Sequence, residues 1–162
     1  MEKILIFGNS GSGKSTLAKK LANTKQLAHL DLDTLAWLPT SPPERTTIEK
    51  AYADINKFTQ QHSNWVIEGC YSDLLTLLLD QANEIIFMDL TVDDCIKNAK
   101  SRPWEPHKYP SKQAQDENLA MLINWIKAYE QRDDVFSLSA HQQLFDSFQG
   151  RKHRYITNIS AQ

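Results

Sequence analysis

Short apolar runs alternate along the chain with stretches in which apolar residues recur every three or four positions. Apolar runs lie at 4–7, 64–71 and 84–90, and segments with a shorter alternation lie at 26–33 and 153–157. Runs of this length and character are typical of strands in a sheet that is buried on both faces. We therefore expect these segments to form the strands of a parallel sheet.

Segments with helical spacing fill the intervals between the expected strands. They begin directly after residue 13 and then lie at 48–58, 72–79, 92–99, 113–129 and 139–148. Thr46 or Thr47 is placed to cap the second helix, Thr91 precedes the fourth, and Gly150 follows the last. Strands that alternate with helices predict an α/β domain of three layers.

The segment between the first strand and the first helix carries the most specific chemistry. It has the pattern G-x-x-x-x-G-K-[ST] and reads Gly8-Asn9-Ser10-Gly11-Ser12-Gly13-Lys14-Ser15-Thr16. Glycines let backbone N–H groups turn toward phosphate oxygens, and a helix N-terminus offers further unpaired N–H groups. The pattern predicts binding of ATP with Mg²⁺, in which Lys14 reaches the β- and γ-phosphates and the Ser15 hydroxyl ligates the metal. The alternative is a plain glycine turn.

The predicted phosphate contacts therefore fall on one continuous segment. The nucleotide-binding residues are expected to be Gly8, Ser10, Gly11, Ser12, Gly13, Lys14, Ser15 and Thr16.

Acidic residues end the second expected strand. Asp31 and Asp33 are two positions apart, so on a strand both carboxylates would point into one cleft at the carboxyl edge of the sheet. A carboxylate at this edge can hold a Mg²⁺-bound water or accept a proton from a substrate hydroxyl. The alternative is a pair of solvated turn residues. Trp37, shortly after them, is either a wall on which the substrate stacks or a core aromatic.

The third expected strand also ends in an acidic residue. Glu68 follows Trp65-Val66-Ile67, which is the form of the second motif of nucleoside triphosphatases, whose acid supports Mg²⁺. Gly69 either permits close approach of a substrate or relieves the turn from strand to helix.

Cations and prolines gather after the fourth expected helix. Lys97, Lys100 and Arg102 precede a loop at 103–110 that contains three prolines. We expect residues 102–118 to form a lid within the domain, with Arg102 stabilising the phosphoryl group during transfer. The alternative is a solvated basic loop. His107 and His141 have no partners at metal-ligand spacing and are expected at the surface.

Composition limits the possible classes of function. A chain of 162 residues is expected to be one domain, 1–162, and we expect a monomer. A net charge of −2 argues against a dedicated nucleic-acid binder, and no apolar segment is long enough to predict a membrane partner. The N-terminal apolar run is too short for a signal peptide, and Cys70 and Cys95 lack metal spacing, which predicts reduced thiols in the cytoplasm.

Two sets of residues resemble small P-loop kinases. Asp31-Leu32-Asp33 is similar to the D-x-D of shikimate kinases, and Arg102-Pro103 resembles the arginine and proline of their lid. The segments 32–37 and 65–72 look closer to adenylate-kinase-like bacterial proteins labelled topology modulation proteins. The resemblance implies a three-layer P-loop NTPase fold with a parallel five-stranded sheet and a helical lid.

The resemblance also implies positions for the acceptor. By this resemblance Asp31, the first acid of D-x-D, would lie near magnesium, and Asp33, the second, would contact the acceptor hydroxyl and act in catalysis. Glu68 and Gly69 would border the acceptor pocket, and Trp37 and Tyr71 are also expected to bind the substrate. Arg45 is the nearest candidate for a basic contact to an acceptor carboxylate.

The expected function is that of an ATP-dependent phosphotransferase. It would move the γ-phosphoryl of Mg-ATP to a small acceptor of the nucleotide or shikimate and sugar-acid type, with Lys14, Asp33 and Arg102 in catalysis. One alternative is a nucleotide-dependent switch that acts on a macromolecule such as DNA. A third possibility is a nucleotide binder without turnover.

Overall fold

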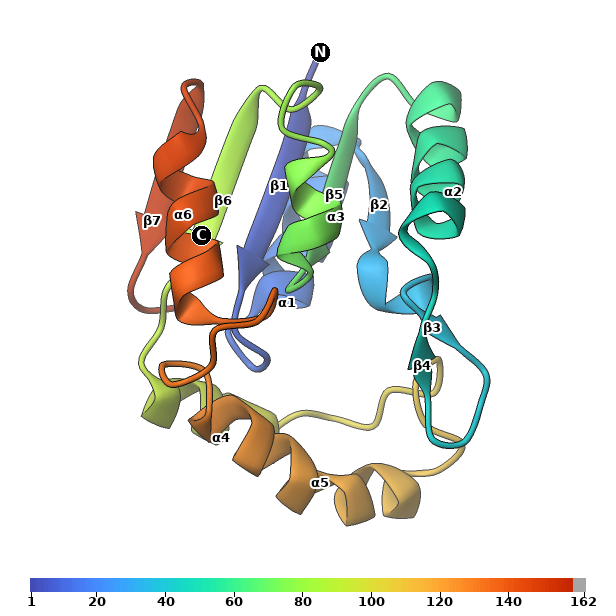
Figure 1. The fold of residues 1–162 in the computed structure, drawn as a ribbon, viewed down its shortest axis with the longest axis vertical. Helices are drawn as coiled ribbons and strands as arrows, with labels where there is room; N and C mark the ends of the chain where they lie inside the picture. The colour runs from blue at the N-terminus through green and yellow to red at the C-terminus, as the bar shows by residue number, and fades with distance from the viewer. Residues whose placement is uncertain (159–162) are drawn as a thin grey trace.

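Five parallel strands form the centre of the molecule in a computed structural model that describes residues 1–158. Their spatial order is β2-β5-β1-β6-β7, so the strand that leads into the phosphate loop lies in the middle (Figure 1). The strands are β1 (Lys3–Gly8), β2 (Ala28–Asp31), β5 (Trp65–Gly69), β6 (Glu84–Met88) and β7 (Arg151–Tyr155). The sequence prediction of a parallel five-stranded sheet is confirmed.

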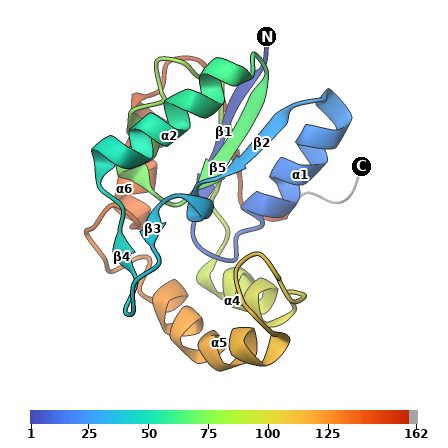
Figure 2. The same ribbon diagram turned by 90° about the vertical axis from the view of Figure 1, so that its right-hand side faces the viewer.

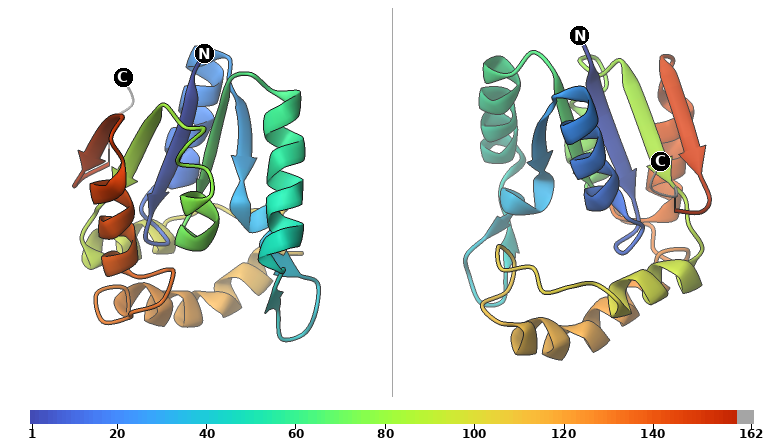
Figure 3. Two further views of the ribbon diagram at one scale, coloured as in Figure 1. Left: turned by 45° about the horizontal axis from the view of Figure 1, so that its top comes forward. Right: turned by 180° about the vertical axis from the view of Figure 1, so that it is seen from behind.

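Helices cover both faces of this sheet. Figure 2 shows α1 on one side and α2 and α6 on the other, and the view from behind in Figure 3 shows α1 across the sheet. Helices α4 and α5 lie beneath the carboxyl ends of the strands (Figure 1). The helices are α1 (Lys14–Lys25), α2 (Ile48–Gln61), α3 (Ser72–Thr76), α4 (Val92–Lys100), α5 (Lys112–Lys127) and α6 (Leu138–Ser147). Within residues 1–158, no helix combines the length and the apolar character that crossing a membrane requires.

Strand alternation divides the core into two layers, one on each side of the sheet. On β1, Leu5 and Phe7 pack into the layer under α3 and α6, whereas Ile4 and Ile6 pack into the layer that includes Leu17 of α1. All four strand residues are fully buried. Burial of both faces explains why these strands appear in the sequence as continuous apolar runs.

The second strand is shorter than the sequence suggested. It ends at Asp31, and a 3-10 turn, η1 (Leu32–Thr34), follows at once. The Asp31 carboxylate accepts the backbone N–H of Asp33 at 3.0 Å and so caps this turn. The expectation that Asp31 and Asp33 lie two apart on one strand is therefore wrong, because the cap turns the chain between them.

Smaller differences appear in two other segments. The segment between the second expected strand and the second expected helix contains an antiparallel pair of short strands, β3 (Trp37–Leu38) and β4 (Glu44–Arg45). The apolar helix expected over 72–79 ends at Thr76 and continues as turns. Thr47 caps α2 and Thr91 caps α4, as two of the predicted caps require.

The placement of His141 contradicts the sequence prediction of a surface group. Its side chain is fully buried. Its Nδ1 lies 2.8 Å from the Tyr129 hydroxyl and its Nε2 lies 2.8 Å from the Cys70 carbonyl oxygen. A carbonyl only accepts, so Nε2–H donates to Cys70 and Nδ1 accepts from Tyr129. The two hydrogen bonds explain how an imidazole can occupy the core.

Burial of His141 makes the stability of the fold depend on pH. Burial lowers the pKa of His141 to about 4, from its ordinary value of 6.5. Between these values the unfolded chain binds a proton that the folded chain does not, so the free energy of unfolding falls as pH falls. We expect the native protein to lose about 2 kcal/mol more stability than His141→Gln between about pH 7 and pH 5, measured by urea unfolding. Equal losses in both proteins would show that His141 does not carry this dependence.

Candidate functional site

The phosphate loop is pressed closely against its neighbours. Gly11 has φ of 79° and Gly13, which begins α1, has φ of 90°, values that side chains other than glycine rarely adopt. A Cβ atom on Gly11 would lie only 2.4 Å from the carbonyl oxygen of Cys95 in α4. The close approach of α4 is therefore possible only with glycine at this position.

Two asparagines from distant segments hold the loop from outside. Asn98 of α4 donates to the carbonyl of Gly11 at 2.9 Å, and Asn158 donates to the carbonyl of Ser12 at 3.1 Å. Asn98 also donates to the side-chain oxygen of Asn158 at 2.8 Å. Because these bonds go to carbonyls, they occupy none of the N–H groups of the loop. Sequence reasoning did not identify these asparagines, because neither belongs to a local motif.

The loop forms one wall of a cleft of about 560 Å³ at the carboxyl edge of the sheet. Gly8 and Ser12 lie behind this wall and are buried. The predicted phosphate-binding residues that line the cleft are Ser10, Gly11, Gly13, Lys14, Ser15 and Thr16. Lys14 curls back to donate to the Asn9 carbonyl at 2.7 Å.

Glu68 lies at the centre of the site, at the end of β5. Its side chain is only 2% exposed. The Ser15 hydroxyl donates to its Oε1 at 3.0 Å, and Nε2 of His29 lies 2.8 Å from its Oε2. Sequence reasoning missed His29, although it precedes Asp31 by two positions on the same strand and therefore shares its face.

The register of the strands brings a second carboxylate beside Glu68. Asp31 of β2 is paired directly with Glu68 of β5. Burial raises the pKa of Asp31, and the negative charges of Glu68 and Asp33 raise it further. The structure thus brings the expected acidic residues together, although Asp33 reaches the group from a turn.

Asp33 is held by two hydrogen-bond donors. The Tyr71 hydroxyl donates to Oδ1, and the Lys108 ammonium donates to Oδ2 at 2.9 Å. Partial burial alone would raise the pKa of Asp33, but the charge of Lys108 and the Tyr71 hydrogen bond outweigh it and hold that pKa below its usual value.

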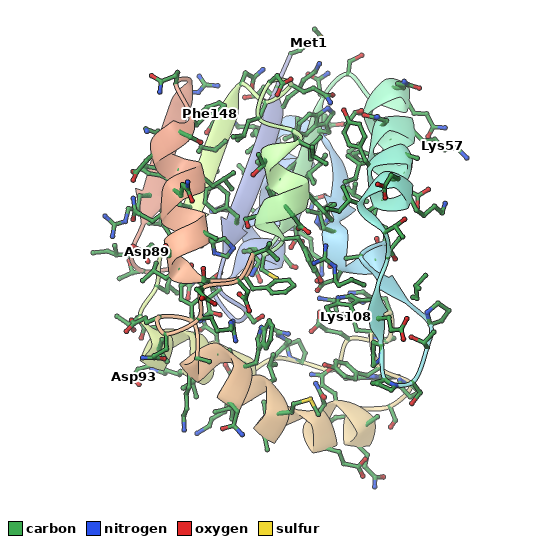
Figure 4. The ribbon with its side chains drawn as sticks, viewed as in Figure 1. Met1, Lys57, Asp89, Asp93, Lys108 and Phe148 are labelled. Carbon is green, nitrogen blue, oxygen red and sulfur yellow. The ribbon has the colours of Figure 1, made fainter. Side chains whose placement is uncertain are left out.

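Lys108 belongs to the proline-rich segment after α4, and sequence reasoning did not single it out from the other cations there. Figure 4 labels it between the strand ends and the helices beneath them. Its Nζ also lies 3.5 Å from Asp31 Oδ2 and 3.6 Å from Glu105 Oε2. Glu105 in turn pairs with Arg102 at 3.1 Å, and all three residues of this segment line the cleft. The segment therefore contacts the acidic residues through a network of ion pairs.

The aromatic residues expected to border a substrate lie behind Asp33. Neither Trp37 nor Tyr71 is among the described residues that line the cleft. The Trp37 indole donates to the Tyr71 hydroxyl at 2.8 Å, and Trp37 remains 40% exposed, so it is not a core residue. Tyr71 is 2% exposed, and burial raises the pKa of its hydroxyl, followed by the charges of Cys70 and Asp33.

Arg45 points into this aromatic cluster. Its guanidinium carbon lies 4.9 Å from the centre of the Tyr71 ring, and its NH2 lies 3.1 Å from Asp73 Oδ2. Arg45 is also absent from the described residues that line the cleft, whereas Gly69 does line it. Arg45, which the sequence suggested as a contact for an acceptor carboxylate, therefore packs against the aromatic cluster instead.

Comparisons with known proteins give a family match and a fold neighbour. Residues 4–120 match the family model described as "AAA domain". A search of curated proteins gave no match. A crystal structure of shikimate kinase from Bacteroides thetaiotaomicron is similar at 15% sequence identity, with a TM-score of 0.48, over 90% of this chain and 97% of that chain.

The close contact at Gly11 predicts that a single methyl group will disrupt the phosphate loop. We expect Gly11→Ala to lower stability by about 2 kcal/mol and to weaken nucleotide binding, because the backbone conformation is strained and a carbonyl blocks the Cβ. The matched variant is Gly69→Ala, whose Cβ would meet side-chain atoms of Leu32 at 3.0 Å and 3.1 Å. Gly69 has no positive φ, and a side-chain atom of Tyr71 at 3.1 Å is its remaining close neighbour, so a shift of a few tenths of an ångström would suffice and Gly69→Ala should retain ATP binding in calorimetry. Equal behaviour of both variants would contradict the prediction.

Proposed function

The chain belongs to the AAA domain family, and within that family we propose that it is an ATP-dependent phosphotransferase with a small-molecule acceptor. One observation supports this function above all. Acidic residues that can orient a hydroxyl and a segment rich in cations face each other across the cleft that the phosphate loop lines. Phosphoryl transfer depends mainly on positioning and on charge stabilisation, and this arrangement offers both.

The phosphate loop is the proposed site for the triphosphate. Its N–H groups and the N-terminus of α1 favour anionic groups. The hydrogen bond from Lys14 to the Asn9 carbonyl keeps the ammonium folded over the loop. Phosphate oxygens would replace that carbonyl as its partner, so Lys14 would neutralise negative charge without leaving the cleft.

The acidic groups beside Ser15 fit a magnesium ion that accompanies the nucleotide. Ser15, Asp31 and Glu68 would supply oxygen donors, which Mg²⁺ prefers. Within residues 1–158, no three His, Cys, Asp or Glu side chains are grouped as a metal site made of protein alone. Mg²⁺ at phosphate sites is held by one or two carboxylates together with the phosphates, so this arrangement suits it. When bound, the ion would neutralise phosphate charge.

Asp33 is the proposed group that orients the acceptor hydroxyl. Both of its oxygens have donors in the structure, so an incoming hydroxyl must displace one of them. The Tyr71 side chain is buried, and its hydroxyl also accepts a hydrogen bond from Trp37. Lys108, in contrast, has a long flexible side chain and lies in a loop. We infer that Lys108 moves away and that the Oδ2 atom of Asp33 then becomes the contact for the acceptor hydroxyl.

We propose that residues 102–118 act as the lid. Glu105 connects Arg102 and Lys108, so withdrawal of Lys108 from Asp33 would shift the segment that carries Arg102. Arg102 would then be free to pair with the phosphoryl group as it is transferred, which is the role of cations in such lids. A cleft of about 560 Å³ is ample for a nucleotide or sugar-acid acceptor beside part of the triphosphate.

Removal of the Lys14 ammonium should abolish binding of the nucleotide. Saturating Mg-ATP at about 100 times its Kd should stabilise the native protein by about 2.7 kcal/mol, seen as a rise in Tm. We expect no rise for Lys14→Ala and a full rise for Lys57→Ala, because Lys57 is exposed on α2 far from the cleft (Figure 4). A normal rise for Lys14→Ala would contradict the assignment of the phosphate loop.

Removal of the Asp33 charge should separate transfer from nucleotide binding. A screen of nucleoside monophosphates, shikimate and gluconate for acceptor-dependent ADP release identifies the acceptor. With that acceptor as substrate, Asp33→Asn should lower kcat by about 10²- to 10⁴-fold, while the rise in Tm with Mg-ATP persists. Asp146→Asn, an exposed change on α6 outside the cleft and outside residues 102–118, is the control. Absence of turnover with every acceptor would overturn the transferase proposal, and normal kcat in Asp33→Asn would remove the role of Asp33.

A further inference from the structure

Both carboxylate oxygens of Glu68 are held by side chains that lie on different elements. The Ser15 hydroxyl of α1 occupies Oε1, and the His29 imidazole of β2 occupies Oε2. We propose that His29 is a positioning residue for the divalent cation that accompanies the nucleotide, acting through Glu68 and Ser15. This inference rests on the magnesium assignment within the proposed function.

Strand pairing explains how the three residues meet. His29 is paired with Val66 and Asp31 with Glu68, in the parallel register of β2 and β5. Alternate residues of a strand share a face, so His29, Asp31 and Glu68 all point to the side that α1 covers. Ser15 lies in the first turn of α1 and reaches Glu68 from that side. The imidazole is thus placed one step behind the carboxylate, away from the cleft.

Glu68 accepts both of these hydrogen bonds. A carboxylate oxygen accepts, so His29 Nε2 carries a hydrogen and donates to Oε2, while the Ser15 hydroxyl donates to Oε1. A serine hydroxyl has one hydrogen and two lone pairs. Donation to Glu68 therefore fixes the hydroxyl rotor and leaves the lone pairs of Ser15 for a cation.

Glu68 needs such an anchor because Asp31 lies opposite it. Two carboxylates in directly paired positions repel each other, and a glutamate side chain has several rotatable bonds with which to turn away. The donor at Oε2 opposes that rotation. His29 itself is not among the described residues that line the cleft, and its side chain is 21% exposed. It therefore acts on the site through Glu68 and does not contact the ligands.

Metal-dependent nucleotide binding tests this role without any acceptor. Calorimetry gives the Kd for ATP with excess Mg²⁺ and again in EDTA, and the ratio of the two values is the gain from the metal. Loss of a partner behind a metal ligand lowers metal affinity by roughly 10- to 100-fold. We expect His29→Leu to lower the gain by about that factor, with the Kd in EDTA changed by less than about threefold.

Four further variants separate positioning from simple structural support. His29→Gln should keep most of the gain, because its amide can donate to the same oxygen. Glu68→Gln should lose at least as much of the gain as His29→Leu, and the double variant of His29→Leu with Glu68→Gln should lose little more than Glu68→Gln alone, because His29 acts through Glu68. His62→Gln, an exposed change after α2, should match the native protein.

Each outcome bears on the inference in a distinct way. The inference would be overturned if His29→Leu had the same gain from Mg²⁺ as the native protein. It would also be overturned if His29→Leu weakened ATP binding equally with Mg²⁺ and in EDTA. A native protein that binds ATP without any gain from Mg²⁺ would overturn it too, and nucleotide binding would still stand. A native protein that binds no ATP would remove both proposals. A metal gain that depends on His29 in a protein without turnover would support the inference while the transferase proposal failed.

Discussion

The parallel pairing of β2, β5 and β1 is the constraint on which the rest of the site depends. It aligns Asp31 with Glu68 and Ile6 with Glu68, so the acids arrive at the sheet edge beside the strand that continues into the phosphate loop. A slip of one residue in either pair would turn these carboxylates to the opposite face, into the apolar layer beneath α3 and α6. The same register that buries the core therefore also selects which side chains meet the loop.

Charged side chains that line the cleft form ion pairs with one another. Asp33 has the Lys108 ammonium, and Arg102 has Glu105. A charge without a partner in a partly buried site is costly, and these ion pairs hold residues 102–108 against the acidic residues. Ligands that bind here must exchange these ion pairs for others of similar quality. In the proposed lid, such an exchange would couple the position of residues 102–118 to what occupies the cleft.

Much of the architecture could be predicted because it follows from periodicity. Uninterrupted apolar runs predicted β1, β5 and β6, and the phosphate-loop motif predicted a strand before it and a helix after it. The family match confirms the predicted assignment to a P-loop family, and the topology-modulation branch stays a prediction. The parallel five-stranded sheet is likewise confirmed.

The details that escaped prediction depend on contacts between distant residues. His141 was expected at the surface because only the fold shows that Tyr129 and Cys70 supply its partners. Lys108 could not be separated from neighbouring cations until Asp33 was placed opposite it. The assigned roles of the site residues stay predictions, since geometry alone gives their positions.

The contact between Asn158 and Ser12 has a consequence for how the protein is made. The loop at residues 8–16 is synthesised before Asn158, one of its two outer hydrogen-bond partners, because Asn158 follows β7. A growing chain on the ribosome therefore carries an incompletely fastened loop until the last strand has joined the sheet. Ligand capture by a nascent chain would accordingly lag behind formation of its central strands.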